Sequence, residues 1–171
     1  MRRTLSVLVE NSPGVLSKVT GLFSRRGFNI HSLAVGPTND PAISRITIVV
    51  NGDEYLVEQL EKQLNKLIPV IKVKVLEEGC YISRALTLVK VSADAKNRHE
   101  LMKIAELMGA KIVDVSKSSL TLEFTDTDSR KATFIEMLRP YGIRELVQTG
   151  QIAIEVGPDS SLRPKADKES I

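Results

Sequence analysis

The chain has 171 residues, a formal net charge of +3, and 42% hydrophobic and 26% charged residues. This is the balance of an ordinary soluble globular protein, not of a disordered one. Charges interrupt every hydrophobic stretch, so no run reaches the ~18 consecutive apolar residues that a membrane helix needs. The N-terminal MRRTLSVLVE has too few apolar residues for a signal peptide. We therefore expect a soluble, cytoplasmic chain.

The residue inventory excludes several chemistries. The single cysteine, Cys80, rules out an internal disulfide framework and is expected to be half-buried. Two separated histidines, His31 and His99, cannot form a His/Cys metal cluster. The sequence contains no Gly-rich phosphate loop, G-x-S-x-G elbow or H-E-x-x-H motif. We predict no catalytic residue, no metal site and no cofactor bound by this chain.

The first 76 residues predict the order β-α-β-β-α-β. Thr4–Glu10 alternates as a half-buried strand does. Asn11 or Ser12 is expected to cap a helix that starts at Pro13, and Arg25-Arg26-Gly27 ends it. The remaining elements are strands at 28–35 and 43–50, a helix over 56–67 that ends before Pro69, and a strand over 70–76 with Lys72 and Lys74 on its outer face. This order is that of the ferredoxin-like fold, with two helices on one face of a four-stranded antiparallel sheet.

The same order restarts after a polar linker. Strands are predicted over 85–91, 111–116 and 119–125, with helices over 101–108 and after Asp126, where Asp126 and Asp128 act as the cap. Residues 143–156 supply a final strand or a hairpin around Gly150. The predicted fold is therefore α+β with two tandem ferredoxin-like domains: 1–76, a linker at 77–83, 84–156, and a disordered tail at 157–171.

The segment Asn11–Leu16 is the most informative one, because a strand runs directly into a helix there. The first N–H groups of a helix have no partner within the helix, and with the helix dipole they favour an anion. Gly14 leaves the backbone open to a ligand carboxylate. We expect Asn11 and Asn29 to bring amide groups to the same end of the sheet. The residues alone fit equally well a plain cap at Asn11 and a turn at Asn29.

A family resemblance favours the ligand site. The stretch VLVENSPGVLSKVTGLFSRRGFNIHSLAVGPTNDPAISRITIVV and the later VKVLE closely resemble the ACT domain of the small regulatory subunits of acetohydroxyacid synthase, also called acetolactate synthase. The resemblance extends over nearly the whole chain, including a C-terminal ACT-like domain of matching length.

Subunits of this family have no activity of their own. The resemblance implies that this chain binds the large catalytic subunit, activates it and confers valine feedback inhibition in branched-chain amino-acid synthesis. Thiamine diphosphate, magnesium and FAD are expected in that partner. The chain is expected to form a homodimer through its ACT domains. The implied valine-binding residues are Asn11, Gly14, Val15 and Leu16 of one subunit, with Asn29 and Ile30 of its neighbour.

Two other functions stay open on the residues. One is an ACT-type amino-acid sensor for a different metabolic enzyme. The other is a ferredoxin-like module that binds nucleic acid, which the sequence pI of ≈ 9.0 suggests. This second function is less favoured, because the aromatic content of 4% provides few stacking platforms and no basic block exists. We expect neither a nucleic-acid nor a membrane partner.

Overall fold

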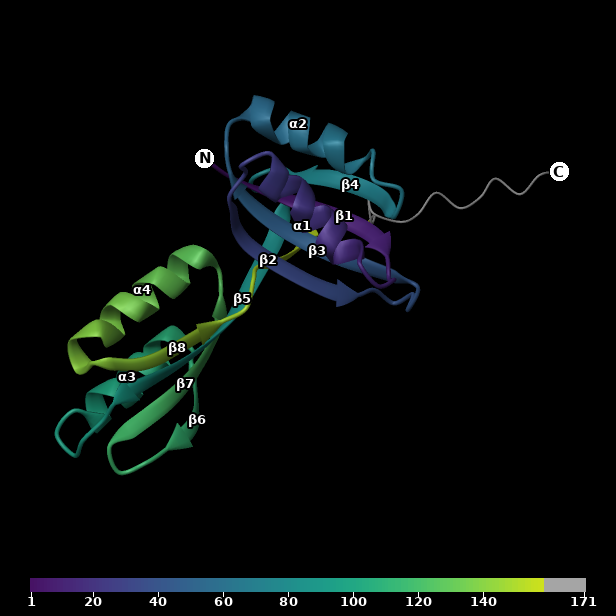
Figure 1. The fold of residues 1–171 in the computed structure, drawn as a ribbon. Coiled ribbons are helices and arrows are strands. Elements are labelled where there is room, and N and C mark those ends of the chain that lie inside the picture. The colour runs from purple at the N-terminus through teal and green to yellow at the C-terminus, as the bar shows by residue number, and fades with distance from the viewer. Residues whose placement is uncertain (159–171) are drawn as a thin grey trace. The chain divides into compact units, whose positions relative to one another are not determined.

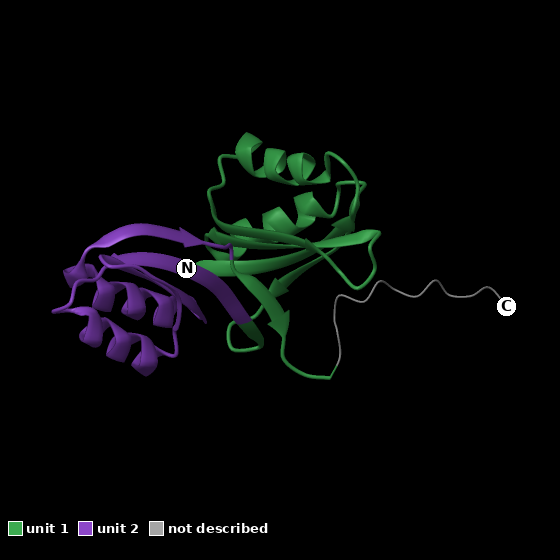
Figure 2. Cartoon of the chain, turned by 90° about the horizontal axis from the view of Figure 1, so that it is seen from below, with its two compact units in different colours: residues 1–82, 151–171 green, residues 83–150 purple. Residues whose placement is uncertain are grey.

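A computed structural model describes residues 1–158, so most of the predicted tail, 159–171, lies outside the described residues. The chain divides into two compact units (Figure 2). Among the described residues, the first unit contains 1–82 and 151–158, and the second contains Ser83–Gly150. The prediction placed 151–156 in the second domain, whereas the structure groups this segment with the first unit.

The first unit has the predicted βαββαβ order (Figure 1). Its elements are β1 (Arg2–Glu10), α1 (Val15–Arg25), β2 (Ile30–Pro37), β3 (Ile43–Asn51), α2 (Glu54–Leu64) and β4 (Val70–Leu76). The strands form an antiparallel sheet in the order β2-β3-β1-β4. Gly27 adopts φ 68 just after α1, which is the left-handed exit predicted from Arg25-Arg26-Gly27.

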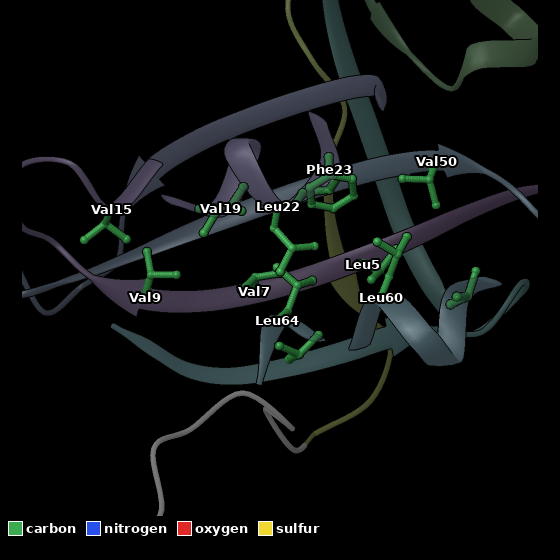
Figure 3. Close-up of a cluster of buried hydrophobic side chains, with 14 residues drawn as sticks. Leu5, Val7, Val9, Val15, Val19, Leu22, Phe23, Val50, Leu60 and Leu64 are labelled. Carbon is green, nitrogen blue, oxygen red and sulfur yellow. The ribbon is translucent and has the colours of Figure 1, made fainter. Parts of the chain in front are cut away.

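The core of this unit lies between the sheet and its two helices (Figure 3). Every second residue of β1 points toward the helices, and fully buried side chains of α1 and α2 pack on them. The central members are Leu5, Val7, Val9, Val19, Leu22, Phe23, Leu60 and Leu64. The apolar spacing in the sequence therefore identified the face of each element that packs inside.

The other face of this sheet is also covered, contrary to the half-buried strand predicted for β1. Thr4, Ser6 and Leu8 point away from the helices, yet all three are buried. The cover comes from a distant part of the chain, β9 (Ile152–Glu155), which pairs with β5. The Gln151 N–H donates to Ser32 Oγ of β2 over 2.8 Å.

Charged and hydroxyl side chains hold this cover in place. Lys74 lies on the outer face, as predicted, but it is not free in solvent because it forms an ion pair with Glu155. The Thr4 and Tyr81 hydroxyl groups share a hydrogen bond of 3.2 Å. Burial lowers the pKa of the Arg45 guanidinium, and the carboxylate of Glu155 partly opposes this effect.

The second unit repeats the fold. Its elements are β5 (Tyr81–Ser92, of which the first two residues belong to the first unit), α3 (Arg98–Met108), β6 (Lys111–Val115), β7 (Ser119–Asp126), α4 (Asp128–Leu138), a 3₁₀ turn (Arg139–Tyr141) and β8 (Ile143–Gln148). Its sheet has the equivalent order β6-β7-β5-β8, which confirms the predicted tandem fold. Since β8 and β9 both pair with β5, residues 143–156 form two separate strands and not a hairpin around Gly150.

The cap of α4 differs from the prediction. Thr127 is the N-cap, and its hydroxyl accepts the Arg130 N–H, while Asp128 supplies negative charge in the first turn. Asp126 lies one residue earlier. Burial raises the pKa of its carboxyl, but the Thr127 N–H and the Arg130 guanidinium outweigh burial, so the net shift is downward.

None of the helices within residues 1–158 has the length and the apolar character needed to cross a bilayer.

Candidate functional site

The loop between β1 and α1 is anchored by two neighbouring loops. The Glu10 N–H donates to Pro69 O over 2.9 Å, and the Asn11 N–H donates to Ala42 O over 2.8 Å. The Asn11 side-chain amide donates to Pro41 O, also over 2.8 Å. Asn11 therefore anchors the loop to the β2–β3 connection. It does not cap α1, so the alternative in which Asn11 is a plain helix cap is wrong.

Helix α1 begins in an unusual way. Its N-cap is Gly14, which precedes a helix that starts at Val15, two residues later than the predicted start at Pro13. No side chain caps this end, and the first turn holds no acidic residue. The Val15 N–H reaches only Ser12 O, at 3.4 Å. The positive end of the α1 dipole therefore faces solvent without a carboxylate of its own.

Each of the other α-helices of residues 1–158 has an acidic residue in its first turn. The Asp53 carboxylate accepts the Leu56 N–H at the start of α2 over 2.8 Å, and Glu54 lies in that first turn. Helices α3 and α4 carry Glu100 and Asp128 in their first turns. Among these α-helices, only α1 lacks a carboxylate in its first turn that would compete with an external anion for the backbone N–H groups.

The second repeat fills the equivalent loop with its own carboxylate. Ala93 follows β5 as Asn11 follows β1, and the Oδ1 of the next residue, Asp94, accepts the Lys96 and Asn97 N–H groups over 2.8 and 3.0 Å. Hydrogen bonds from these two N–H groups lower the pKa of Asp94. The two repeats share a fold but treat this corner in opposite ways.

Position 14 favours glycine because of its backbone conformation, and not because a side chain there would clash with its neighbours. Its φ is +83, in the left-handed region that favours glycine. A Cβ added there would meet no atom within 4 Å, so the backbone is open to an approaching ligand. Val15 is buried in the core and offers only its backbone, whereas the side chain of Leu16 is 41% exposed and provides an apolar surface beside the loop.

Asn29 and Ile30 lie at the opposite end of the sheet, so the expectation that Asn11 and Asn29 share one end is wrong. The strand register aligns Ile30 with Val50 and then with Arg3, at the beginning of β1. Asn11 follows the other end of that strand, roughly 25 Å away at ~3.3 Å per residue. The reason is that a crossover helix joins β1 to β2, which makes these two strands run in the same direction. A single chain cannot bring the six predicted residues together.

Sequence reasoning missed the residues that position the loop, Pro41 and Ala42. The signal was present, because in a βαββαβ unit the β2–β3 connection lies at the end where β1 finishes. Cys80 was predicted to be half-buried, but it is exposed. His31 and His99 are both exposed. Within the described part of the chain, no three His, Cys, Asp or Glu side chains are grouped as metal ligands would be.

Comparison with known proteins identifies the family. A family model for the AHAS small subunit-like ACT domain matches residues 5–72. A second, described as the small subunit of acetolactate synthase, matches residues 84–157.

Individual proteins agree with these matches. The acetolactate synthase small subunit of Mycolicibacterium smegmatis is 52% identical over 91% of each chain. A probable acetolactate synthase small subunit of Archaeoglobus fulgidus is 48% identical over 92% of this chain and 98% of its own length. The crystal structure of the acetolactate synthase small subunit from Thermotoga maritima superposes with a TM-score of 0.87, at 37% identity, over 93% of this chain and 99% of that one. This chain therefore belongs to the family of acetolactate synthase small subunits, the non-catalytic regulatory subunits of that enzyme.

Proposed function

We propose that this chain makes the catalytic subunit of acetolactate synthase sensitive to valine and raises its activity, and so regulates the synthesis of valine, leucine and isoleucine. Membership of the family implies the large catalytic subunit as partner. The thiamine diphosphate, magnesium and FAD are assigned to that partner. The observation that carries the effector part of the proposal is the start of α1, which offers backbone donors and an unopposed dipole.

The valine carboxylate is placed against the backbone N–H groups of Gly14, Val15 and Leu16. Its ammonium group fits the side-chain oxygens of Asn11 and of the neighbouring chain's Asn29, because an amide accepts as well as donates. Its isopropyl group rests on apolar surface that includes Leu16, which is partly exposed. Burying such a side chain contributes about 1.5–3 kcal/mol, which favours valine over glycine roughly 10- to 100-fold.

The same proposal requires two chains. Asn29 and Ile30 lie far from Gly14 in one chain, but a two-fold axis beside β2 reverses the direction of the second copy. The start of the partner's β2 then comes near the end of this one, where the loop lies. The edge of β2 suits such a pairing, because Ser32–Pro37 carries no charge and no interruption of its register with β3. A long uncharged edge strand is a template for a further strand.

Isothermal titration of valine into the purified chain tests the effector, with glycine and leucine as controls. Selective binding of valine supports the proposal, whereas equal binding of all three amino acids contradicts it. A second titration in the presence of saturating large subunit tests regulation. Because linkage is reciprocal, a subunit whose activity responds to valine must change the affinity for valine. An unchanged affinity would contradict the coupling.

Mixing two defective chains tests the shared site. A Gly14→Asp chain lacks a working loop, and an Asn29→Ala chain lacks the contribution from β2. If the site is shared, each mixed dimer regains one intact site, so random exchange restores about a quarter of the valine sites. A site built within one chain gives no recovery on mixing. Each variant titrated alone is the control.

A further inference from the structure

The strand that covers the first sheet carries an apolar face of its own. Along β9 the side chains alternate, with Ala153 buried and the carboxylate of Glu155 turned inward to its ion pair on β4. Ile152, Ile154 and the next such residue, Val156, point the opposite way and are exposed by 62%, 59% and 60%. Single exposed apolar residues are ordinary, but a row of three on one face indicates an interaction surface.

The neighbouring strand β5 adds a fourth such side chain. β9 continues along β5 in the direction of β8, which is antiparallel to β5. The Val156 N–H donates to Cys80 O over 3.0 Å, so Ile154 lies opposite Ile82, whose side chain is 49% exposed. All of these residues belong to the first unit. We call Ile82, Ile152, Ile154 and Val156 the ribbon face.

β9 also has a free edge. The Val156 N–H points to β5, so by the alternation of a strand the N–H groups of Ala153 and Glu155 point to the other side. Among the described residues, β9 pairs with β5 alone. An open edge beside exposed β-branched side chains promotes aggregation unless a partner covers it. The molecule therefore needs a cover here that residues 1–158 do not supply.

We propose that the large catalytic subunit of acetolactate synthase binds the ribbon face. This inference rests on the proposed function, and it assigns a surface to the partner that family membership implies. Lasting interfaces have an apolar centre with a polar rim. Glu77 and Glu78 are exposed in the turn before Cys80, which lies beside Val156 and so at one end of the ribbon face. The complementary surface is therefore apolar, with basic groups at that end.

The large subunit fits this face better than a second copy does, because of what the ribbon contacts on its inner side. The Gln151 N–H donates to Ser32 Oγ over 2.8 Å, and Ser32 is two residues from Ile30, which the proposed valine site includes. A change at the effector site therefore has a short route to a partner on the ribbon face. The proposed homodimer already uses the edge of β2, and a further self-contact would link dimers into larger assemblies.

Thiol labelling of the full-length chain tests the contact. In a Cys80→Ser background, Ile154→Cys is the probe and Ile68→Cys is the matched control, because Ile68 belongs to the same unit and is 95% exposed. With the large subunit at about ten times its dissociation constant for each variant, labelling at 154 should slow about tenfold, while labelling at 68 stays unchanged. Equal rates at 154 with and without the large subunit would overturn the proposal. So would slow labelling of the chain alone that dilution or removal of residues 159–171 relieves, because a second copy or the chain's own end would then be the cover.

A charged side chain on the ribbon face provides a second measurement. Ile154→Arg should bind the large subunit about tenfold more weakly than wild type in sedimentation of the mixture, whereas Ile68→Arg, which adds the same charge, should bind as wild type does. Unchanged affinity of the Ile154 variant would refute the contact, and circular dichroism checks that both variants fold.

Valine titration into the small subunit alone keeps the two proposals apart. Because residue 154 points away from the sheet, Ile154→Arg should bind valine as wild type does. If wild type binds no valine but still protects residue 154 with the large subunit, the effector site is refuted and the ribbon face is supported.

Discussion

Replacing Gly14 by aspartate is the most direct perturbation of the proposed valine site, and asparagine is its matched control. Both side chains have the same shape, so they differ by one negative charge. Neither meets an obstacle, since a Cβ at this position has no atom within 4 Å. Both must adopt φ near +83, which Asn and Asp tolerate better than other residues. Neither can cap α1 in this conformation, because a capping residue needs an extended backbone.

The magnitude follows from Coulomb's law. A carboxylate on residue 14 would lie about 5 Å from the carboxylate of a bound valine. With an effective dielectric constant between about 20 and 80 for this exposed loop, repulsion amounts to about 1–3 kcal/mol. Valine should therefore bind the Asp variant roughly 5- to 150-fold more weakly than the Asn variant. The strain of a left-handed residue, about 1–2 kcal/mol at most, is common to both and cancels in the comparison.

Titration calorimetry measures the two affinities, and the activity of the large subunit with and without valine measures the response. We expect Gly14→Asp to lose feedback inhibition at valine concentrations that still inhibit the Asn variant, while both variants still activate the catalytic subunit. Equal valine affinity in the two variants would refute the placement of the carboxylate at the start of α1. Raising the ionic strength should reduce the difference, because the loop is exposed.

Three further outcomes follow from the contacts. Glu155→Gln removes the ion pair with Lys74, so the first unit should lose about 1 kcal/mol of unfolding free energy in urea titration, whereas Glu78→Gln in the exposed turn should lose none. The lowered pKa of Asp126 contributes stability above the ordinary carboxyl pKa near 4, which is lost as the pH falls through the lower folded value. Wild type should therefore lose more unfolding free energy between about pH 5 and 2 than Asp126→Asn does, and parallel losses would disprove this role. Because Asp94 occupies its own loop, calorimetry should saturate at one valine per chain, and two equivalent sites would contradict the comparison of the repeats.

The apolar periodicity and the turn residues predicted the helices and strands well, because each element depends mainly on residues close together in the sequence. The bounds of β4 agree with the predicted 70–76, and Gly109 ends α3 in the left-handed conformation as expected. The burial of β1 on both faces could not be predicted from such local patterns. Its second cover, around Ala153, comes from a segment more than a hundred residues away in the chain. Periodicity within a strand carries no information about a partner so distant in sequence.

The placement of Asn29 is a different kind of error, because the sequence already contained the correct answer. Once a crossover helix is assigned between two strands, those strands must be parallel, and the start of β2 must lie with the start of β1. The alignment of Ile30 with Val50 shows this directly. The correction also changes the meaning of the predicted residues, since a site that includes both Asn29 and Gly14 must be assembled from two chains.

The two repeats have the same fold, but they differ at the loop between the first strand and the first helix. Each βαββαβ unit ends its first strand in a loop that leads to a helix, and that corner can attract an anion in either unit. In the first repeat Gly14 leaves the corner open, whereas in the second repeat the carboxylate of Asp94 satisfies the loop from within. A ligand that enters the second corner would have to displace a covalently tethered anion of the same charge. The proposed valine site is therefore assigned to the first repeat alone.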